Sequence, residues 1–388
     1  MKEVDVAIVG GGVAGCAAAL TLTRYTNLSV AVFERSSLER ARPGEHVSDG
    51  ALPLLQYLGV DVSALLRETV PGGIPLSAWG DAELRRGPAS AGRTERAWFV
   101  DRARFDRMLA DEARRRCALF SQRRSIRGAA FDGATGRWEL LADGVRVCAR
   151  ALIDAGGIAA PVARALGGPF VTDDALYAVV GRVRGGDPSP RDLVLEASAD
   201  GWWYAVPVPD DGLVVAFLTD LATMRRERCN RPAQWMRTLA LTRHVAPLVA
   251  AREPSTLDTI FVPSRRLTAP AAFRWIAAGD AAMATDPLAA MGIGFALHSG
   301  ASAARAIAAE LSGDAEPARV YARRLIEAFD RYRITRRALY ATVTRWSDRP
   351  FWIGRTGVTP VSHGATFDTS ERRWEDGTAC SSAASARS

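Results

Sequence analysis

Lysine is nearly absent from this chain: Lys2 is the single lysine among 50 basic residues, and arginine supplies all the others. The arginines are scattered along the sequence rather than gathered with aromatic residues, so the net charge of +7 does not indicate nucleic acid as a partner. Cysteine is scarce as well, since the five cysteines are widely spaced and form no C-x-x-C pair. This spacing argues against a disulfide framework or a zinc site and favours a reducing compartment.

Long apolar runs are also missing. Glycines interrupt the run Ala7–Leu22, and no other stretch approaches the ~18 apolar residues that a membrane helix needs. No histidine pair or acidic series has metal-binding spacing, so no metal is expected. What remains is 388 residues with 48% hydrophobic content, which is ordinary for a globular protein of two domains. We expect a cytoplasmic protein without stable membrane association.

The first forty residues carry a nucleotide-binding pattern. VDVAIVGGGVAGCAAALTL predicts a strand, a glycine-rich turn and a helix, and it meets the G-x-G-x-x-G spacing. The helix start would offer free N–H groups to a pyrophosphate. Glu34, at the end of the next strand, would bind a ribose and repel a 2′-phosphate, which favours FAD or NAD over NADP. The expected contacts are Gly10, Gly12, Val13, Ala14, Gly15, Glu34 and Arg35.

Two later stretches favour FAD. Residues 151–157, ALIDAGG, and residues 274–280, RWIAAGD, predict two more apolar strands that end in Asp and Gly. Asp280 would accept a hydrogen bond from a ribityl hydroxyl. The loop 286–294, DPLAAMGIG, would bring bare backbone and a helix N-terminus to the ring, where a reduced flavin carries negative charge. The expected contacts here are Asp280, Pro287, Gly292 and Ile293.

Taken in order, these stretches resemble the flavoprotein monooxygenase superfamily with the para-hydroxybenzoate hydroxylase fold, which includes flavin-dependent halogenases. A narrower resemblance is to the flavoprotein monooxygenases of cysteine tryptophylquinone maturation. It is carried by RPGEHVSDGALPLLQYLGV (42–60), WFVDRARFDRMLADEA (98–113), GWWYAVPVP (201–209) and LYATVTRWSDRPFW (339–352). In the superfamily the arginines of R-x-G-E and V-x-R-x-x-F-D contact FAD, so the resemblance assigns FAD contacts to Arg42 and Arg102.

The resemblance implies an FAD-dependent monooxygenase that delivers oxygen from a C4a-hydroperoxyflavin to an electron-rich aromatic ring. An indole or a phenol is expected as substrate, and a tryptophan within a peptide or protein is one such group. No second G-x-G-x-x-G is present, so NAD(P)H would bind transiently as reductant, or a separate reductase would supply the electrons.

Candidate catalytic residues are few. They are His46, Trp202, Tyr204 and His298, with Trp79 as a further candidate for the pocket wall. Because side chains alternate along a strand, Trp202 and Tyr204 are expected on one face and Trp203 on the other. The alternative is that all three aromatic residues belong to the sheet core.

Several other functions are compatible with the same fold: a small-molecule tailoring oxygenase, a reductase or a halogenase. Flavin halogenases use a lysine beside the substrate, whereas Lys2 precedes the first predicted strand here, and arginine is a poor nucleophile. A non-catalytic flavin-binding maturation partner is another alternative, because residues 154–158 and 286–291 depart from the superfamily pattern.

The predicted fold class is α/β. Residues 1–70, 98–168 and 270–312 are expected to form a discontinuous, FAD-binding, Rossmann-like domain of glutathione-reductase type. Residues 71–97 and 169–269 would form an interleaved, mostly antiparallel β-sheet substrate domain. Residues 313–370 are predicted to be helical, and residues 371–388 a disordered tail.

Overall fold

A computed structural model describes residues 2–39, 42–86, 97–185, 192–209, 212–250 and 252–356 of the chain. The predicted tail, residues 371–388, lies outside the described residues. The helices are α1 (Val13–Tyr25), α2 (Leu52–Tyr57), α3 (Val62–Arg67), α4 (Arg102–Arg116), α5 (Pro161–Ala165), α6 (Leu221–Glu227), α7 (Pro232–Leu239), α8 (Val245–Val249), α9 (Gly292–Leu311), α10 (Glu316–Ala341) and α11 (Pro350–Thr356).

The first sheet has a parallel centre with the strand order β17-β18-β11-β1-β2-β8, and β9 and β10 extend it as an antiparallel branch from β11. Its strands are β1 (Lys2–Val9), β2 (Val30–Glu34), β8 (Leu119–Gln122), β9 (Ile126–Asp132), β10 (Arg137–Ala142), β11 (Val145–Asp154), β17 (Ala271–Ala272) and β18 (Trp275–Ala277). The central strands are almost wholly apolar because both faces are covered, as parallel sheets require.

The parallel strands end together at one edge. Val9 is paired with both Asp154 and Phe33, and Asp154 is paired with Ala277. The carboxyl ends of β1, β2, β11 and β18 therefore converge, and in open α/β sheets ligands bind outside such an edge.

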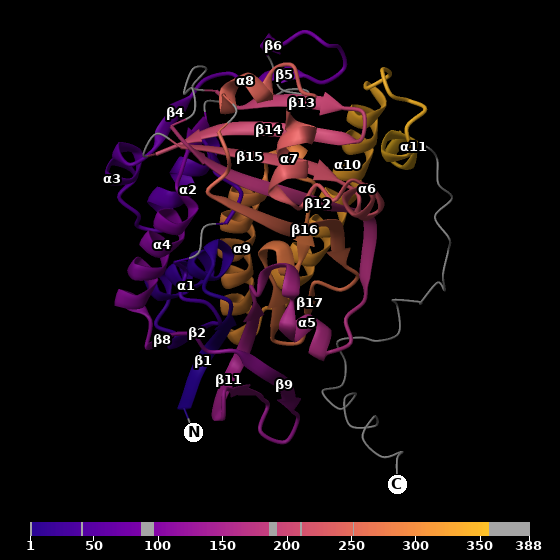
Figure 1. Ribbon diagram of the computed structural model, residues 1–388. Helices are drawn as coiled ribbons and strands as arrows, with labels where there is room; N and C mark the ends of the chain where they lie inside the picture. Colours follow the sequence, from indigo (N-terminus) through magenta and orange to yellow (C-terminus); the bar gives the residue numbers. More distant parts are fainter. Residues whose placement is uncertain are drawn as a thin grey trace.

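The second sheet is mostly antiparallel, with the order β19-β16-β12-β15-β14-β13-β5-β6. Its strands are β5 (Leu76–Ala78), β6 (Arg85–Arg86), β12 (Phe170–Arg184), β13 (Val194–Ser198), β14 (Gly201–Val208), β15 (Gly212–Thr219), β16 (Thr256–Leu267) and β19 (Met283–Ala284). Figure 1 shows this sheet above the first one, with α7 in front of it. Trp203 of β14 packs on Trp235 of α7, so one face of the sheet is closed by helices and the other face is turned to the interior of the molecule.

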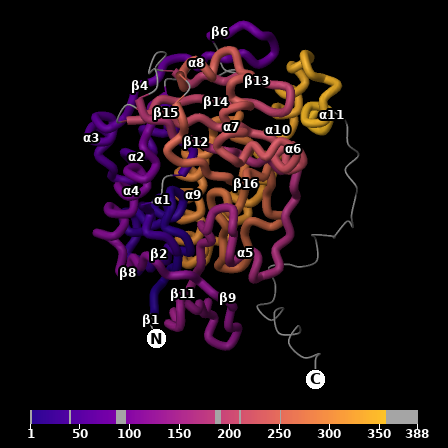
Figure 2. The backbone as a smooth tube through the Cα atoms, viewed as in Figure 1, coloured from indigo at the N-terminus to yellow at the C-terminus, as the bar shows by residue number. Residues whose placement is uncertain are grey.

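The remaining elements join the two sheets. A small third sheet is formed by β3 (His46–Ser48), β4 (Val70–Gly72) and β7 (Ala97–Phe99). α1 and α9 lie side by side although they are far apart in the sequence (Figure 2). Strand β19 lies within the range 270–312 but pairs with β16, so this part of the predicted flavin domain also contributes to the second sheet. Within the described residues, no helix is both long enough and apolar enough to cross a membrane.

Candidate functional site

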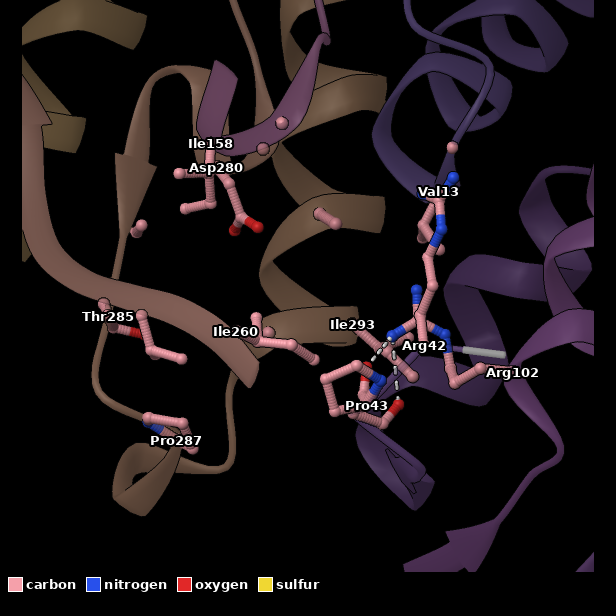
Figure 3. A pocket seen from close by; sticks show the side chains of 18 of the residues that line it. Val13, Arg42, Pro43, Arg102, Ile158, Ile260, Asp280, Thr285, Pro287 and Ile293 are labelled. Atoms are coloured by element: carbon pink, nitrogen blue, oxygen red, sulfur yellow. Dashed lines mark hydrogen bonds between the residues drawn. The ribbon is translucent and has the colours of Figure 1, made fainter. Parts of the chain in front are cut away.

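A cavity of about 1020 Å³ lies at the carboxyl ends of the parallel strands and extends to the inner face of the second sheet. Figure 3 shows part of its wall, with Asp280 and Pro287 on one side and Val13, Arg42 and Arg102 on the other. Most residues predicted from the sequence line this cavity: Gly10, Gly12, Val13, Ala14, Glu34, Arg35, Arg42, His46, Arg102, Trp202, Tyr204, Asp280, Pro287, Gly292 and Ile293.

The glycine-rich turn leaves room for a ligand against bare backbone. Gly10 has φ +105°, and a Cβ there would lie 2.2 Å from the carbonyl oxygen of Ala155. At Gly12, by contrast, the nearest atom to an added Cβ is an Arg42 nitrogen at 4.0 Å. Gly12 is also the N-cap of α1 and provides no side-chain cap, so the first N–H groups of the helix remain available. This arrangement suits a pyrophosphate.

Glu34 closes the end of β2 with a carboxylate that is 5% exposed. Its Oε2 accepts a hydrogen bond from the Gly11 N–H at 2.7 Å, and its Oε1 accepts from the Ser36 N–H at 2.8 Å and the Ser36 hydroxyl at 2.6 Å. Because a carboxylate has about four acceptor positions, Oε2 can accept one further donor, such as a ribose hydroxyl.

Arg102 fixes the segment that precedes β3. Its Nη1 donates to the carbonyl oxygens of Pro43 at 2.8 Å and Gly44 at 3.2 Å (Figure 3). Asp106 pairs with the same guanidinium. Arg42, within that segment, donates to the Ser36 hydroxyl at 3.0 Å. The two arginines predicted from the resemblance therefore lie together on the cavity wall and place positive charge beside Glu34 and the start of α1.

Asp280 and the start of α9 form the opposite wall. Asp280 is exposed to the cavity, but the surrounding protein raises the pKa of its carboxyl, and the positive charges of Arg102 and Arg265 oppose that rise. Met291, the N-cap of α9, gives no side-chain cap, and nothing lies within 4 Å of a Cβ added at Gly292. Backbone N–H groups and the positive end of the α9 dipole thus face the cavity. They would stabilise the negative charge of a reduced flavin ring.

The loop before α9 is held by a buried network. Asp286 accepts hydrogen bonds from the Leu288 N–H at 2.9 Å, the Tyr340 hydroxyl at 2.7 Å and Arg336 Nε at 3.2 Å. Tyr340 in turn accepts the indole N–H of Trp202 at 3.0 Å. The cavity-lining Trp202 is thereby connected to the loop that carries Pro287.

The aromatic residues of β14 alternate as the sequence predicts. Trp202 and Tyr204 belong to the core cluster on the cavity side, whereas Trp203 belongs to the cluster beneath α7. Trp79 packs edge-on against Trp202 at 5.9 Å and donates to the Leu339 carbonyl oxygen, so it supports the wall from behind. It is not among the residues that line the cavity, contrary to the expectation for it.

Two further predicted site residues, Gly15 and His298, are not part of the cavity wall. Gly15 packs α1 onto the strand turn, because a Cβ there would lie 1.8 Å from the Gly10 carbonyl oxygen. His298 is exposed on α9, where partial burial and the charges of Arg305 and Arg324 lower the pKa of its imidazole. It is not among the residues that line the cavity, so the structure gives no support to a catalytic role for it.

Sequence reasoning missed other residues of the site. Glu45 stands next to the expected His46, is 3% exposed and lines the cavity. Arg336 and Tyr340 are distant in sequence from the loop that they hold, and nothing in their local pattern indicates this contact. Asp154, which ends β11, is used internally, since it accepts hydrogen bonds from the N–H groups of Gly156, Val162 and Ala163.

The chain is similar in sequence and in structure to known flavoproteins. Residues 3–347 match the family described as FAD binding domain. The chain is 30% identical to LodB of Marinomonas mediterranea, a protein named as an FAD-dependent oxidoreductase, over 94% of this chain and all of that protein. Among solved structures, the flavin-dependent halogenase CmlS is 28% identical with a TM-score of 0.81, covering 92% of this chain and 68% of that one.

A second structure resembles this chain in its fold. The peptidyl tryptophan dihydroxylase QhpG, essential for tryptophylquinone cofactor biogenesis, has a TM-score of 0.73 and 24% identity. The match covers 94% of this chain and 81% of QhpG.

Proposed function

Because this chain belongs to the FAD-binding domain family and is an FAD-dependent oxidoreductase of the flavoprotein monooxygenase superfamily, we propose that it hydroxylates an electron-rich aromatic ring. An indole or a phenol is the substrate group, and a tryptophan in a peptide or protein is the favoured example. The observation that carries this proposal is a single cavity that joins the bare start of α9 to the Trp202 face of the second sheet.

The cavity residues fit FAD along its length. Bound FAD supplies the redox and oxygen-activating chemistry. The first turn of α1 would hold the pyrophosphate, Glu34 a ribose hydroxyl and Asp280 a ribityl hydroxyl, and the start of α9 would face the ring. The apolar inner face of the second sheet would orient the substrate and keep bulk water from the reacting atoms.

Electrons would come from NAD(P)H that binds transiently or from a separate reductase. The sequence supports this proposal because it holds one G-x-G-x-x-G turn, which the flavin would use. The absorbance of NADH or NADPH is measured while the FAD-loaded protein is present, with and without an aromatic substrate. Oxidation of the nicotinamide by this protein alone indicates direct reduction, and its absence indicates a separate reductase.

Halogenation is the second candidate, favoured by the similarity to CmlS. The position of the single lysine argues against it. Lys2 stands at the amino end of β1, whereas Val9 and Gly10, at the opposite end of that strand, line the cavity. A non-catalytic maturation partner is the third candidate and is motivated by the unusual residues at 154–158 and 286–291.

One experiment separates these candidates. The FAD-loaded protein is reduced, then exposed to isotopically heavy O2 with tryptophan-containing peptides or small indoles and phenols, in the presence and absence of chloride and bromide. We expect a substrate mass gain of one heavy oxygen atom for each reduction of the flavin, whether or not halide is present. A halogen mass would establish the halogenase, and tight FAD binding with no oxygen consumption would establish the maturation partner.

A further inference from the structure

The cavity continues past the groups assigned to FAD to a part of its wall that is mainly apolar. This part is formed by Ala178, Leu195, Val206, Ile260 and Val262. The polar side chains that line the cavity include Glu45, Ser77 and Tyr204. In a largely apolar pocket, a few polar groups fix the orientation of the ligand.

Strand register places two of these side chains together. Ser77 of β5 is paired with Leu195 of β13, and Leu195 is paired with Tyr204 of β14. Residues directly opposite each other in neighbouring strands point to the same face of a sheet. The hydroxyls of Ser77 and Tyr204 therefore belong to one row on the cavity side, on either side of Leu195.

Glu45 approaches the cavity from the segment before β3. Its Oε2 accepts the Gly44 N–H at 3.0 Å, whereas its Oε1 is buried and has no hydrogen-bond partner. Its negative charge contributes, after burial, to raising the pKa of the Tyr204 hydroxyl, so the two groups lie near each other.

Two of these groups lack hydrogen-bond partners within the described part of the chain. The Glu45 Oε1 and the Ser77 hydroxyl are buried without one, and the Tyr204 hydroxyl lies in the same wall. Buried polar groups in proteins are nearly always paired, and exceptions that gather in one cavity indicate a ligand that provides the missing donors and acceptors.

We propose that Glu45, Ser77 and Tyr204 form a polar subsite that takes the single N–H or O–H group of the aromatic substrate, with the Glu45 carboxylate accepting its hydrogen bond. This inference rests on the proposed function, because it takes the substrate to be an indole or a phenol. The inference adds that the aromatic ring must carry an unsubstituted N–H or O–H group, and it identifies the residues that bind this group.

The charges around Glu45 set the expected pH dependence. Burial raises the pKa of the Glu45 carboxyl, and the positive charges of Arg182 on β12 and Arg102 on α4 oppose this rise. Tyr204 faces it from β14, and His46 is its neighbour in the chain. Since the carboxylate forms as pH rises through this elevated pKa, the affinity for an N–H donor should increase over that range.

The test uses FAD-loaded protein and two probes, skatole and its N-methyl derivative, which differ by the indole N–H. Binding is followed by the change in the flavin absorbance spectrum across a pH series. We expect skatole to bind about tenfold more tightly than the N-methyl probe, because a hydrogen bond to a charged group is lost in the latter. The preference should grow as pH rises.

Variants assign the effect to individual residues. Glu45→Gln should reduce the preference severalfold and abolish its pH dependence, while Ser77→Ala and Tyr204→Phe, which leave the Glu45 carboxylate in place, should reduce the preference less and keep its pH dependence. Glu39→Gln, at an exposed position, is the matched control and should behave as the wild type. The two hydroxyl variants keep the test informative if Glu45→Gln fails to fold.

Different outcomes separate this inference from the proposed function. Equal affinity of the two probes, no saturable skatole binding, or an unchanged pH dependence in Glu45→Gln would overturn the subsite. Hydroxylation of N-methylated indoles at an undiminished rate would overturn it as well and leave the monooxygenase proposal standing. A clear preference for skatole without any oxygen transfer would support the subsite and contradict the monooxygenase.

Discussion

Individual carboxylates in this protein have different functions, which depend on the backbone N–H groups that donate hydrogen bonds to them. Asp154 is 0% exposed and satisfied entirely by the turn that follows it. Glu34 anchors Gly11 and Ser36 but keeps an acceptor position at the cavity. Both residues end parallel strands, so their position in the sequence pattern is alike and only the surrounding donors distinguish them.

Replacement of Glu34 by alanine should produce largely apoprotein. The change removes an acceptor for the ribose and releases the Gly11 N–H, and hydrogen bonds to a charged group contribute about 1.5–3 kcal/mol each. The dissociation constant for FAD should therefore rise about 10–100-fold, measured by quenching of flavin fluorescence. Glu39→Ala, which is exposed and pairs with Arg123 at 3.9 Å, is the control and should bind FAD normally. A fully yellow Glu34→Ala protein would refute the assignment.

Among the helices, the close contact between α1 and α9 fixes the positions of their N-termini, both of which face the cofactor cavity. A Cβ added at Gly300 would lie 2.1 Å from the carbonyl oxygen of Ala14, so glycine permits a backbone approach that alanine does not. Small residues along both helices continue this contact, since Ala14, Ala18 and Ala304 are buried there. Helices so close together hold the starts of α1 and α9 on opposite walls of one cavity.

Gly300→Ala should destabilise the protein and weaken FAD binding, because the added methyl forces α1 and α9 apart. Overpacking of this kind costs about 1–3 kcal/mol, measured as the free energy of unfolding in urea. Gly294→Ala provides the matched control in the same helix, where nothing lies within 4 Å of the added Cβ. Since alanine favours helix over glycine, Gly294→Ala should be neutral or stabilising by up to about 1 kcal/mol. Equal effects of the two changes would contradict this account of the crossing.

At the scale of the whole molecule, a buried ion network joins the second sheet and the loop before α9 to helix α10. A register shift in β12 between Thr172 and Asp174 interrupts the strand, and both Asp173 and Asp174 pair with Arg336 of α10. Arg336, with 4% of its side chain exposed, also pairs with Asp286 before α9. Burial acts to lower the pKa of its guanidinium, but Asp286 and Asp174, together with the Tyr340 and Tyr332 hydroxyls, outweigh this effect and raise it. The second sheet, the flavin-facing loop and α10 therefore depend on one side chain.

Arg336→Met should lower the free energy of unfolding by about 3 kcal/mol or more, because it leaves buried carboxylates without their shared cation. Thermal and urea unfolding measure the change, and FAD affinity should fall because the loop at Asp286 loses a partner. The neighbouring Arg337→Met is the control: its side chain is 47% exposed and pairs with Asp173. Its loss should cost about 0–1 kcal/mol. If both variants unfold alike, the network does not join these parts.

The fold class, the first cofactor strand and turn, and the alternation of Trp202, Trp203 and Tyr204 could all be predicted from the amino-acid sequence. These features depend on local rules, namely glycine spacing, strand endings and side-chain period, which are fully present in short stretches. Three features could be seen only in the folded protein: Glu45, Ser77 and Tyr204 line one cavity, His298 is not among the residues that line it, and Arg336 and Tyr340 hold a loop about fifty residues earlier. Such contacts arise from strand register and helix packing between distant segments, and no short stretch of sequence contains them.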